Sequence, residues 1–119
     1  MPATRADMLG FAEQWIETVN RRDFDHLALD FAGLASHLNS TPLVEGEAAR
    51  ASYSRETFDP TKTIEFRLDR VVCDTDRQEM VVVFDRMVSG EHNRACAFMR
   101  FDEQGRAVSV EAMDGAKLA

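Results

Sequence analysis

The chain has 119 residues, of which 45% are hydrophobic and 29% charged, and its 21 acidic against 14 basic side chains give a formal net charge of -7. We expect residues 1–119 to form a single domain with one hydrophobic core, because a chain of this size cannot support two. The acidic excess disfavours nucleic acid and anionic membrane surfaces as partners, and no apolar run is long enough for a membrane-spanning helix, so we expect a cytoplasmic protein.

The first predicted element is a long amphipathic helix that ends near Asn20. Its apolar residues recur at the spacing of one helix face, namely Met8, Leu9, Phe11, Ala12, Trp15, Ile16 and Val19. Thr4 is the predicted N-cap, and Asp7 lies where a carboxylate suits the helix dipole. Trp15 is interpreted first as a core residue and second as a hydrogen-bond donor to a ligand.

Two shorter helices are predicted next. The second helix begins at Asp23 and runs to about Leu34, with apolar residues at helical spacing, namely Leu27, Phe31 and Leu34. Residues 46–55 favour a third helix, and Pro60 closes that segment because the residue before a proline avoids the helical conformation.

The second half of the chain predicts four antiparallel strands in a meander. Alternating or short apolar runs mark the strands at residues 64–69, 80–88, 94–101 and 108–112, and turn-forming residues separate them. Helices followed by such strands indicate an α+β fold. We expect about three N-terminal helices to pack on a curved, mostly antiparallel sheet and to enclose a pocket.

The thiol and imidazole side chains show no spacing typical of a redox or metal site. Cys73 and Cys96 lie in separate apolar stretches without a CxxC pair, and His26, His37 and His92 are scattered along the chain. Local spacing therefore predicts no metal site, which leaves open a site assembled across strands. We also expect no cofactor.

Three strings of the sequence resemble the nuclear transport factor 2-like superfamily, which has a cone-shaped fold. FMRFDEQGRAVSVEAMDG, residues 98–115, is similar to the last two strands of ketosteroid isomerases. PLVEG, residues 42–46, with Arg50 and Tyr53 resembles the segment that leads into the third helix, and QWIETVNRRDFDHL, residues 14–27, resembles the junction of the first two helices. The resemblance covers nearly the whole chain. It implies a fold shared by steroid isomerases, SnoaL-like polyketide cyclases and limonene epoxide hydrolase.

The resemblance does not carry over the catalytic residues of the steroid isomerases. Their helix tyrosine, their base aspartate and their third-strand aspartate correspond here to Trp15, Asn39 and Ala97. An amide has no useful basicity near neutral pH, and alanine donates no hydrogen bond. Steroid isomerisation in its usual form is therefore not expected.

Limonene epoxide hydrolase offers a second comparison. Here His37 and Asn39 resemble the Tyr-x-Asn pair of that enzyme, with histidine in place of tyrosine. Arg86 corresponds to its arginine. Its last-strand aspartate corresponds to Ala112, the position where SnoaL-like cyclases also tend to carry an aspartate. The position of its second aspartate, two residues beyond Arg86, holds Val88. Epoxide hydrolysis in its usual form is therefore not expected, and Asp114, one inward position beyond Ala112, is at most a displaced equivalent.

The inward faces of the strands predict an apolar cavity suited to a small hydrophobic molecule. Strand alternation and the family register place on this face Val82, Phe84, Ala95, Ala97, Met99, Phe101, Val108, Val110 and Ala112. The candidate polar contacts are Trp15, His37, Asn39, Arg86 and Asp114. Each also has a structural interpretation: Trp15 as core, His37 as exposed, Asn39 and Asp114 as turn residues, and Arg86 as the ion-pair partner of Asp114.

The leading hypothesis is a SnoaL-like enzyme that performs cofactor-independent proton transfer, hydration or dehydration on that molecule. In this hypothesis His37 and Asp114 form the acid/base pair, Asn39 orients the ligand and Arg86 stabilises negative charge. The alternative is a non-catalytic ligand-binding or protein-interaction module of the same fold.

The outward faces of the strands predict a homodimer. The residues on this face form an apolar surface too continuous for a monomer, namely Val81, Val83, Met87, Cys96 and Phe98. Asp85 and Arg100 lie on the same face and can pair as opposite charges. Members of the resembled superfamily commonly dimerise through the sheet, and a stable interface would bury roughly 1,200 to 2,000 Å² in total.

Overall fold

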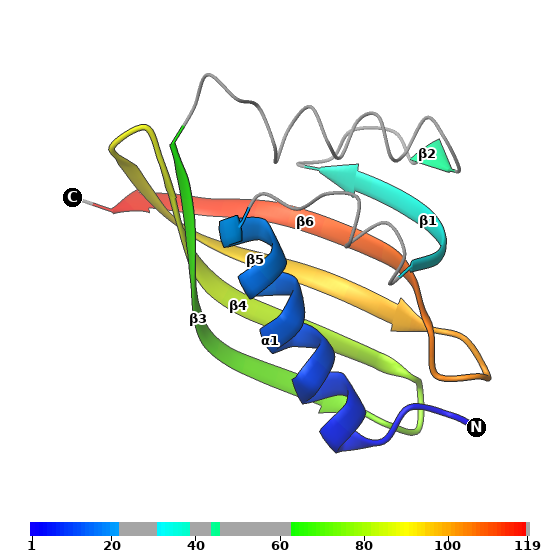
Figure 1. Cartoon of the computed structure of the whole chain (residues 1–119). Coiled ribbons are helices and arrows are strands. Elements are labelled where there is room, and N and C mark those ends of the chain that lie inside the picture. The colour runs from blue at the N-terminus through cyan, green and yellow to red at the C-terminus, as the bar shows by residue number, and fades with distance from the viewer. Residues whose placement is uncertain (22–30, 39–43, 46–62, 119) are drawn as a thin grey trace.

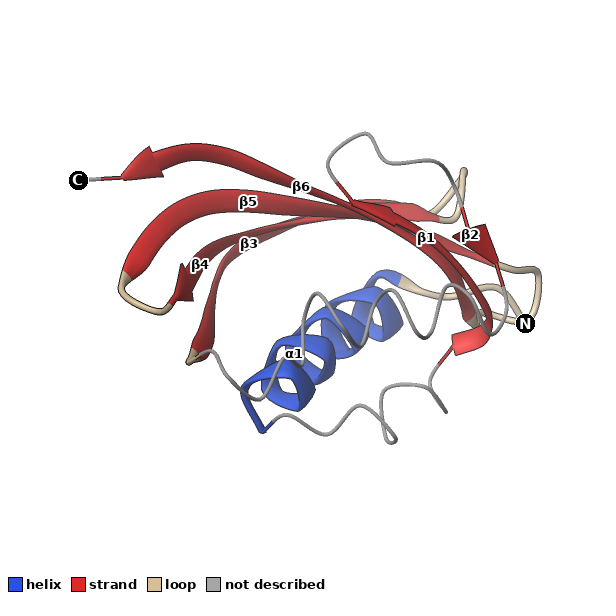
Figure 2. Ribbon diagram, turned by 90° about the horizontal axis from the view of Figure 1, so that it is seen from above, coloured by secondary structure: helices blue, strands red, loops and turns tan. Residues whose placement is uncertain are grey.

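The computed structural model describes residues 1–21, 31–38, 44–45 and 63–118. This part of the chain contains one helix, α1 (Arg5–Arg21), and six strands: β1 (Phe31–Leu38), β2 (Val44–Glu45), β3 (Ile64–Asp74), β4 (Glu79–Val88), β5 (Glu91–Phe101) and β6 (Ala107–Leu118). The strands form one curved sheet, and α1 lies on its concave side (Figures 1 and 2). The predicted α+β class is therefore confirmed.

The order of strands in the sheet is β2-β1-β6-β5-β4-β3. Each strand from β3 to β6 pairs antiparallel with the next, which confirms the predicted four-stranded meander. The two other strands were not predicted: β1 pairs parallel to β6, and β2 pairs antiparallel to β1. The addition of β1 gives hydrogen-bond partners to an edge of β6 that would otherwise expose its backbone groups.

The predicted second helix is wrong over its last residues, because Phe31–Leu38 is the strand β1. Its apolar spacing fits a helix, but Gly33 weakens a helix at this point, and pairing with β6 satisfies the same backbone groups. The earlier part of that predicted helix, residues 23–30, lies outside the described residues. So does the predicted third helix at residues 46–55.

Helix α1 begins and ends as predicted. The Thr4 hydroxyl accepts a hydrogen bond from the Asp7 amide at 3.1 Å, and the Thr4 amide donates to the Asp7 carboxylate at 2.9 Å. This reciprocal pair is a capping box. The hydrogen bonds from the Thr4 amide and hydroxyl hold the pKa of Asp7 below its ordinary value. Five residues of the predicted apolar stripe are buried, namely Met8, Ala12, Trp15, Ile16 and Val19, whereas Leu9 and Phe11 are partly buried.

An aromatic cluster joins the helix to the concave side of the sheet. The ring centroid of Trp15 lies 5.3 Å from that of Phe84 on β4 and 5.7 Å from that of Phe66 on β3, and the two phenylalanine rings are 4.6 Å apart. Nearer the start of the helix, Phe11 contacts Phe101 of β5 edge to face. Trp15 is only 2% exposed, so its interpretation as a core residue is confirmed.

Two side-chain amides fasten α1 at its ends. The Asn20 amide donates to the Phe66 carbonyl at 2.8 Å and accepts from the Phe66 N–H at 2.7 Å. At the other end, Gln78 accepts from the Ala3 N–H at 2.7 Å and donates to the Ala3 carbonyl at 2.9 Å. Each amide pairs with one residue as a neighbouring strand would. The position of α1 over β3 and β4 is therefore fixed by hydrogen bonds as well as by packing.

Replacement of Asn20 by alanine tests this fastening. The Asn20→Ala variant leaves the N–H and C=O groups of Phe66 without these partners, so we expect the free energy of unfolding to fall by about 1 to 2 kcal/mol in a urea titration. The adjacent Arg21→Ala variant is the control, because its exposed ion pair with Glu17 contributes at most about 0.5 kcal/mol. Equal losses in the two variants would contradict the assigned role of Asn20.

Candidate functional site

The concave side of the sheet carries the predicted inward-facing residues. Phe84, Ala97, Met99, Phe101 and Val110 are all buried in the same cluster as Trp15. The strand pairings place them on common rungs, because Met99 lies opposite Val110, and Ala97 lies opposite Ala112. Whether these residues contact a ligand stays a prediction.

One predicted inward position is wrong by a single residue. A bulge interrupts the pairing of β5 with β6, because Arg100 lies opposite Ser109 whereas Phe101 lies opposite Ala107. Ala107 is consequently buried, and Val108 is only partly buried. An extra residue in one strand reverses the alternation beyond it.

Three alanines form the least bulky part of the concave face. Ala97 lies between Val82 of β4 and Ala112 of β6, and Ala95 follows on the next inward rung of β5. We call Ala95, Ala97 and Ala112 the alanine patch. Phe84 and Met99 border it with large side chains. The side chains of the patch are shorter than those of the aromatic cluster, and Ala95 and Ala97 are 5% and 0% exposed.

A charged and a polar residue occupy the rung next to the patch. Arg86 of β4 lies opposite Phe66 on one side and Asn93 of β5 on the other. Since Phe66 is buried against α1, this rung belongs to the concave side, and both Arg86 and Asn93 are partly buried. Asn93 was not among the predicted site residues. The alternation that placed Ala95 and Ala97 inward would have found it.

The other predicted polar residues lie on β1, on β6 or beyond the described residues. For His37 and Asp114 the structure describes the backbone. Asp114 lies opposite Ala95, on a rung of the alanine patch, whereas His37 lies beside Glu111, on the rung of Phe98. Along β6 the two positions are three residues apart, which is about 10 Å. Asn39 lies outside the described residues, so the convergence of these residues on one pocket stays a prediction.

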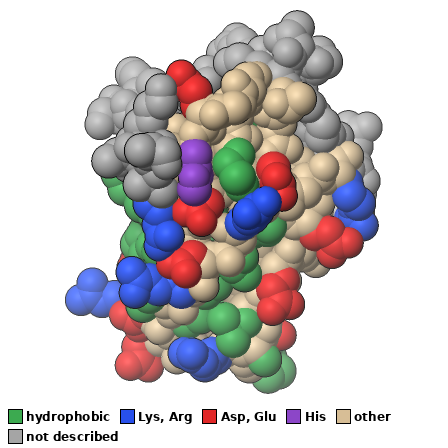
Figure 3. All heavy atoms as spheres, turned by 90° about the vertical axis from the view of Figure 1, so that its left-hand side faces the viewer, with side chains coloured by type: hydrophobic (Ala, Val, Ile, Leu, Met, Phe, Trp, Pro, Cys, Tyr) green, Lys and Arg blue, Asp and Glu red, His purple; other side chains and the backbone are tan. Residues whose placement is uncertain are grey.

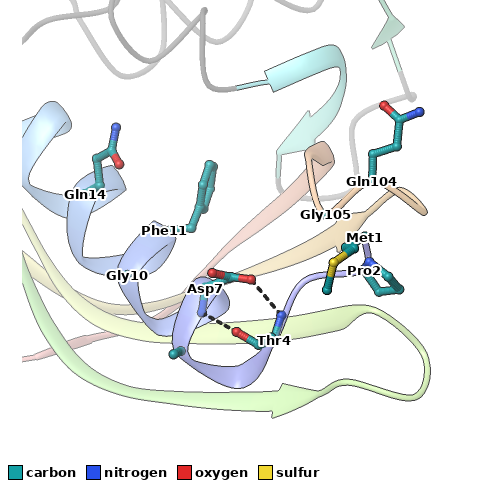
Figure 4. Close-up of a pocket in the computed structure, with 10 residues that line it drawn as sticks. Met1, Pro2, Thr4, Asp7, Gly10, Phe11, Gln14, Gln104 and Gly105 are labelled. Atoms are coloured by element: carbon teal, nitrogen blue, oxygen red, sulfur yellow. Dashed lines mark hydrogen bonds between the residues drawn. The ribbon is translucent and has the colours of Figure 1, made fainter.

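A groove that the sequence did not predict lies at the beginning of α1 (Figure 4). It has a volume of about 700 Å³, and its lining comes from the N-terminal segment, one side of α1 and the β5–β6 turn, including Met1, Asp7, Phe11, Gln14 and Gln104. None of the predicted site residues lines it.

The β5–β6 turn at this groove is held in a defined shape. Gly105 has a φ of +77°, and a Cβ there would lie 2.9 Å from the Met1 carbonyl oxygen, so the turn requires glycine. Hydrogen bonds to the Asp102 carboxylate, led by the one from the Arg106 amide, hold the pKa of Asp102 below its ordinary value. The turn therefore supports the N-terminal segment beside it.

A chain of ion pairs crosses the convex side of the sheet. Arg94 contacts the carboxylates of both Asp69 and Asp85, and His92 Nε2 lies 3.5 Å from the same Asp85 carboxylate. Figure 3 shows acidic and basic side chains gathered around a histidine at one end of the molecule. Within the described ranges, no group of three or more His, Cys, Asp or Glu side chains is arranged to hold a metal ion.

Helix α1 is 17 residues long and amphipathic, and the described part of the chain holds no helix long and apolar enough to cross a bilayer.

Comparison with known proteins gives one matching family and several similar structures. Residues 12–110 match the family model of the SnoaL-like domain. A SnoaL-like protein of unknown function from Burkholderia thailandensis is 18% identical with a TM-score of 0.79, and the match covers 97% of this chain and 100% of that one. No curated protein matches the sequence.

Two further structures have the same fold. SalBIII, an epoxide hydrolase/cyclase-like enzyme of pyran ring formation in the polyether salinomycin, is 15% identical with a TM-score of 0.72, over 87% of this chain and 86% of that one. A protein of unknown function with a cystatin-like fold from Methylobium petroleophilum is 17% identical with a TM-score of 0.78, over 100% of this chain and 82% of that one.

Proposed function

Because the chain belongs to the SnoaL-like domain family, we propose that it binds a small hydrophobic molecule over the alanine patch and acts on it by cofactor-independent proton transfer, hydration or dehydration. The observation that carries this proposal is the combination of the patch with Arg86 and Asn93 on the next concave rung. Apolar walls with a few polar groups at one side are typical of small-molecule sites.

The chemistry follows from what a cation and a carboxylate can do beside an apolar surface. Arg86 stabilises the negative charge that develops on a carbonyl or hydroxyl oxygen of the substrate. Asp114, on the rung of Ala95, removes a proton from a neighbouring carbon and returns it elsewhere in the molecule, which is an isomerisation. Loss of a hydroxyl with that proton is a dehydration. Asn39 as an orienting residue completes the proposal. The backbone of His37 lies on the convex rung of Phe98, so its role as the partner acid or base stays a prediction that this register does not favour.

A ligand-binding module without catalysis is the second candidate. The burial of Trp15 in the core favours it, because Trp15 occupies the position at which steroid isomerases place their tyrosine and makes ring contacts with Phe66 and Phe84. A thermal-unfolding screen against steroids, polyketide-like aromatic molecules and terpene epoxides separates the two candidates. A stabilising compound recovered chemically changed indicates an enzyme, and one recovered unchanged indicates a binding module.

The turnover of such a compound should depend on Arg86. We expect Arg86→Gln to lower kcat by about 10²-fold or more, because electrostatic stabilisation of a developing charge is typically of that size. The control is Arg67→Gln, since Arg67 is exposed on β3 and contacts only the nearby Glu65 among the ion pairs of the described residues. An Arg86→Gln variant with unchanged kcat would exclude Arg86 from the reaction.

We further propose that the convex side of the sheet joins two copies of the chain. Two neighbouring rungs there carry apolar side chains, one with Val72, Val81 and Phe98, and the other with Val83, Cys96 and Met113. Val72 is 59% exposed and Met113 is 41% exposed, which is unusual for large apolar residues on one surface. Within the chain Asp85 pairs with Arg94. The pairing of Asp85 with Arg100 across the two-fold axis stays a prediction.

Light scattering at micromolar concentration tests the homodimer. The native chain should have about twice the monomer mass of 13.4 kDa. Phe98→Glu should return it to the monomer mass, because a charge buried in an apolar interface lacks a partner. Thr75→Glu adds the same charge in an exposed turn and should leave the dimer intact. A monomeric native chain, or a dimer unaffected by Phe98→Glu, would contradict the proposal.

A further inference from the structure

The side chain of Thr18 carries a buried hydroxyl that has no hydrogen-bond partner among the described residues. Its side chain is 0% exposed, and its Oγ1 atom makes no hydrogen bond with any group in the described part of the chain. A threonine within a helix can satisfy its hydroxyl on the carbonyl of the preceding turn, which here belongs to Gln14, but this bond is not formed. A buried hydroxyl without a partner is destabilising, because it has lost its hydrogen bonds to water and gained none in exchange. A polar group retained at that cost points to a partner from outside the chain.

The position of Thr18 on α1 indicates which strand of the concave side its side chain faces. The stripe that contacts Phe66 of β3 and Phe84 of β4 is centred on residues such as Trp15 and Val19, and Thr18 lies on one flank of it. Phe11, which shares this flank two turns earlier, contacts Phe101 of β5. The flank with Phe11 and Thr18 therefore faces β5 rather than the free edge of β3.

The distance along α1 from Phe11 to Thr18 places Thr18 near the alanine patch of β5 and β6. Seven residues of helix from Phe11 to Thr18 span about 10 Å, which corresponds to about three or four residues of strand. The helix ends at the Asn20 contact with Phe66, so it runs from the Phe101 end of β5 back toward the rungs of Ala97 and Ala95. The unpartnered hydroxyl thus lies at the side of the concave face where the strand side chains are shortest.

We propose that the Thr18 hydroxyl binds an oxygen atom of the molecule that occupies the alanine patch. This inference rests on the proposed function and narrows its substrate class: a hydrophobic molecule with a hydroxyl or carbonyl oxygen at the end that faces α1. A hydroxyl side chain can donate to a carbonyl and can both donate to and accept from an alcohol. A hydrocarbon of equal size leaves Thr18 unpartnered and is selected against.

Two probes of nearly equal size, 2-naphthol and 2-methylnaphthalene, test this contact by fluorescence titration. The measured quantity is the ratio of the two dissociation constants. The apolar ring system contributes about equally to the binding of both probes, so its contribution cancels in the ratio. We expect Thr18→Val to shift the ratio against 2-naphthol by about 10-fold or more relative to the native chain. Thr18→Ser keeps the hydroxyl and should keep the native ratio. Thr63→Val, at an exposed position, is the matched control.

The unliganded variants provide an independent measurement. Thr18→Val removes an unpartnered polar atom without loss of volume, so its thermal midpoint should be equal to or higher than that of the native chain. A marked fall in the midpoint, or failure to fold, would show that the hydroxyl serves the fold and would overturn the inference. An unchanged probe ratio in Thr18→Val would overturn it while the proposed function stands. Failure of the native chain to bind either probe would overturn both.

Discussion

The contact of Trp15 with Phe66 and Phe84 determines where every other part of the concave side can lie. It holds α1 over β3 and β4, and the amides of Asn20 and Gln78 fix the helix at both ends on the same hairpin. A helix placed centrally would cover all of the inward rungs. Because α1 is held toward one edge, Trp15 contacts the inward-facing rings of β3 and β4. Most inward-facing residues of β5 and β6 lie farther from the helix.

That asymmetry explains the distribution of side-chain sizes. Large rings fill the space between α1 and the first two strands of the meander, whereas the alanine patch lies beyond them with Arg86 and Asn93 on the adjoining rung. Thr18 lies on the flank of α1 that faces the patch, and its hydroxyl lacks a partner in the described residues. A charged, a polar and an unsatisfied group around a surface of small apolar side chains is an arrangement that a purely structural core does not need.

Local patterns were sufficient to predict much of this fold. The helix spacing around Trp15, the cap at Thr4 and the four strands of the meander each depend on neighbours within a few residues, and the structure confirms them. Pairing between distant strands cannot be derived in this way. Phe31–Leu38 has helical spacing but is held as a strand by β6, and the bulge before Ala107 shifts one inward position by a residue. The rung of His37 depends on the same pairing, and the missing partner of Thr18 depends on the packing of α1.

The central claim is that a hydrophobic molecule lies on the concave side, over the alanine patch. It is tested most directly by the amide chemical-shift changes of the isotope-labelled chain on titration with 2-naphthol. The account predicts that the largest changes occur at the amides of Ala95, Ala97 and Ala112. Changes confined to the groove at Gln104 and Gly105, or to the convex rung of Val81 and Phe98, would contradict it.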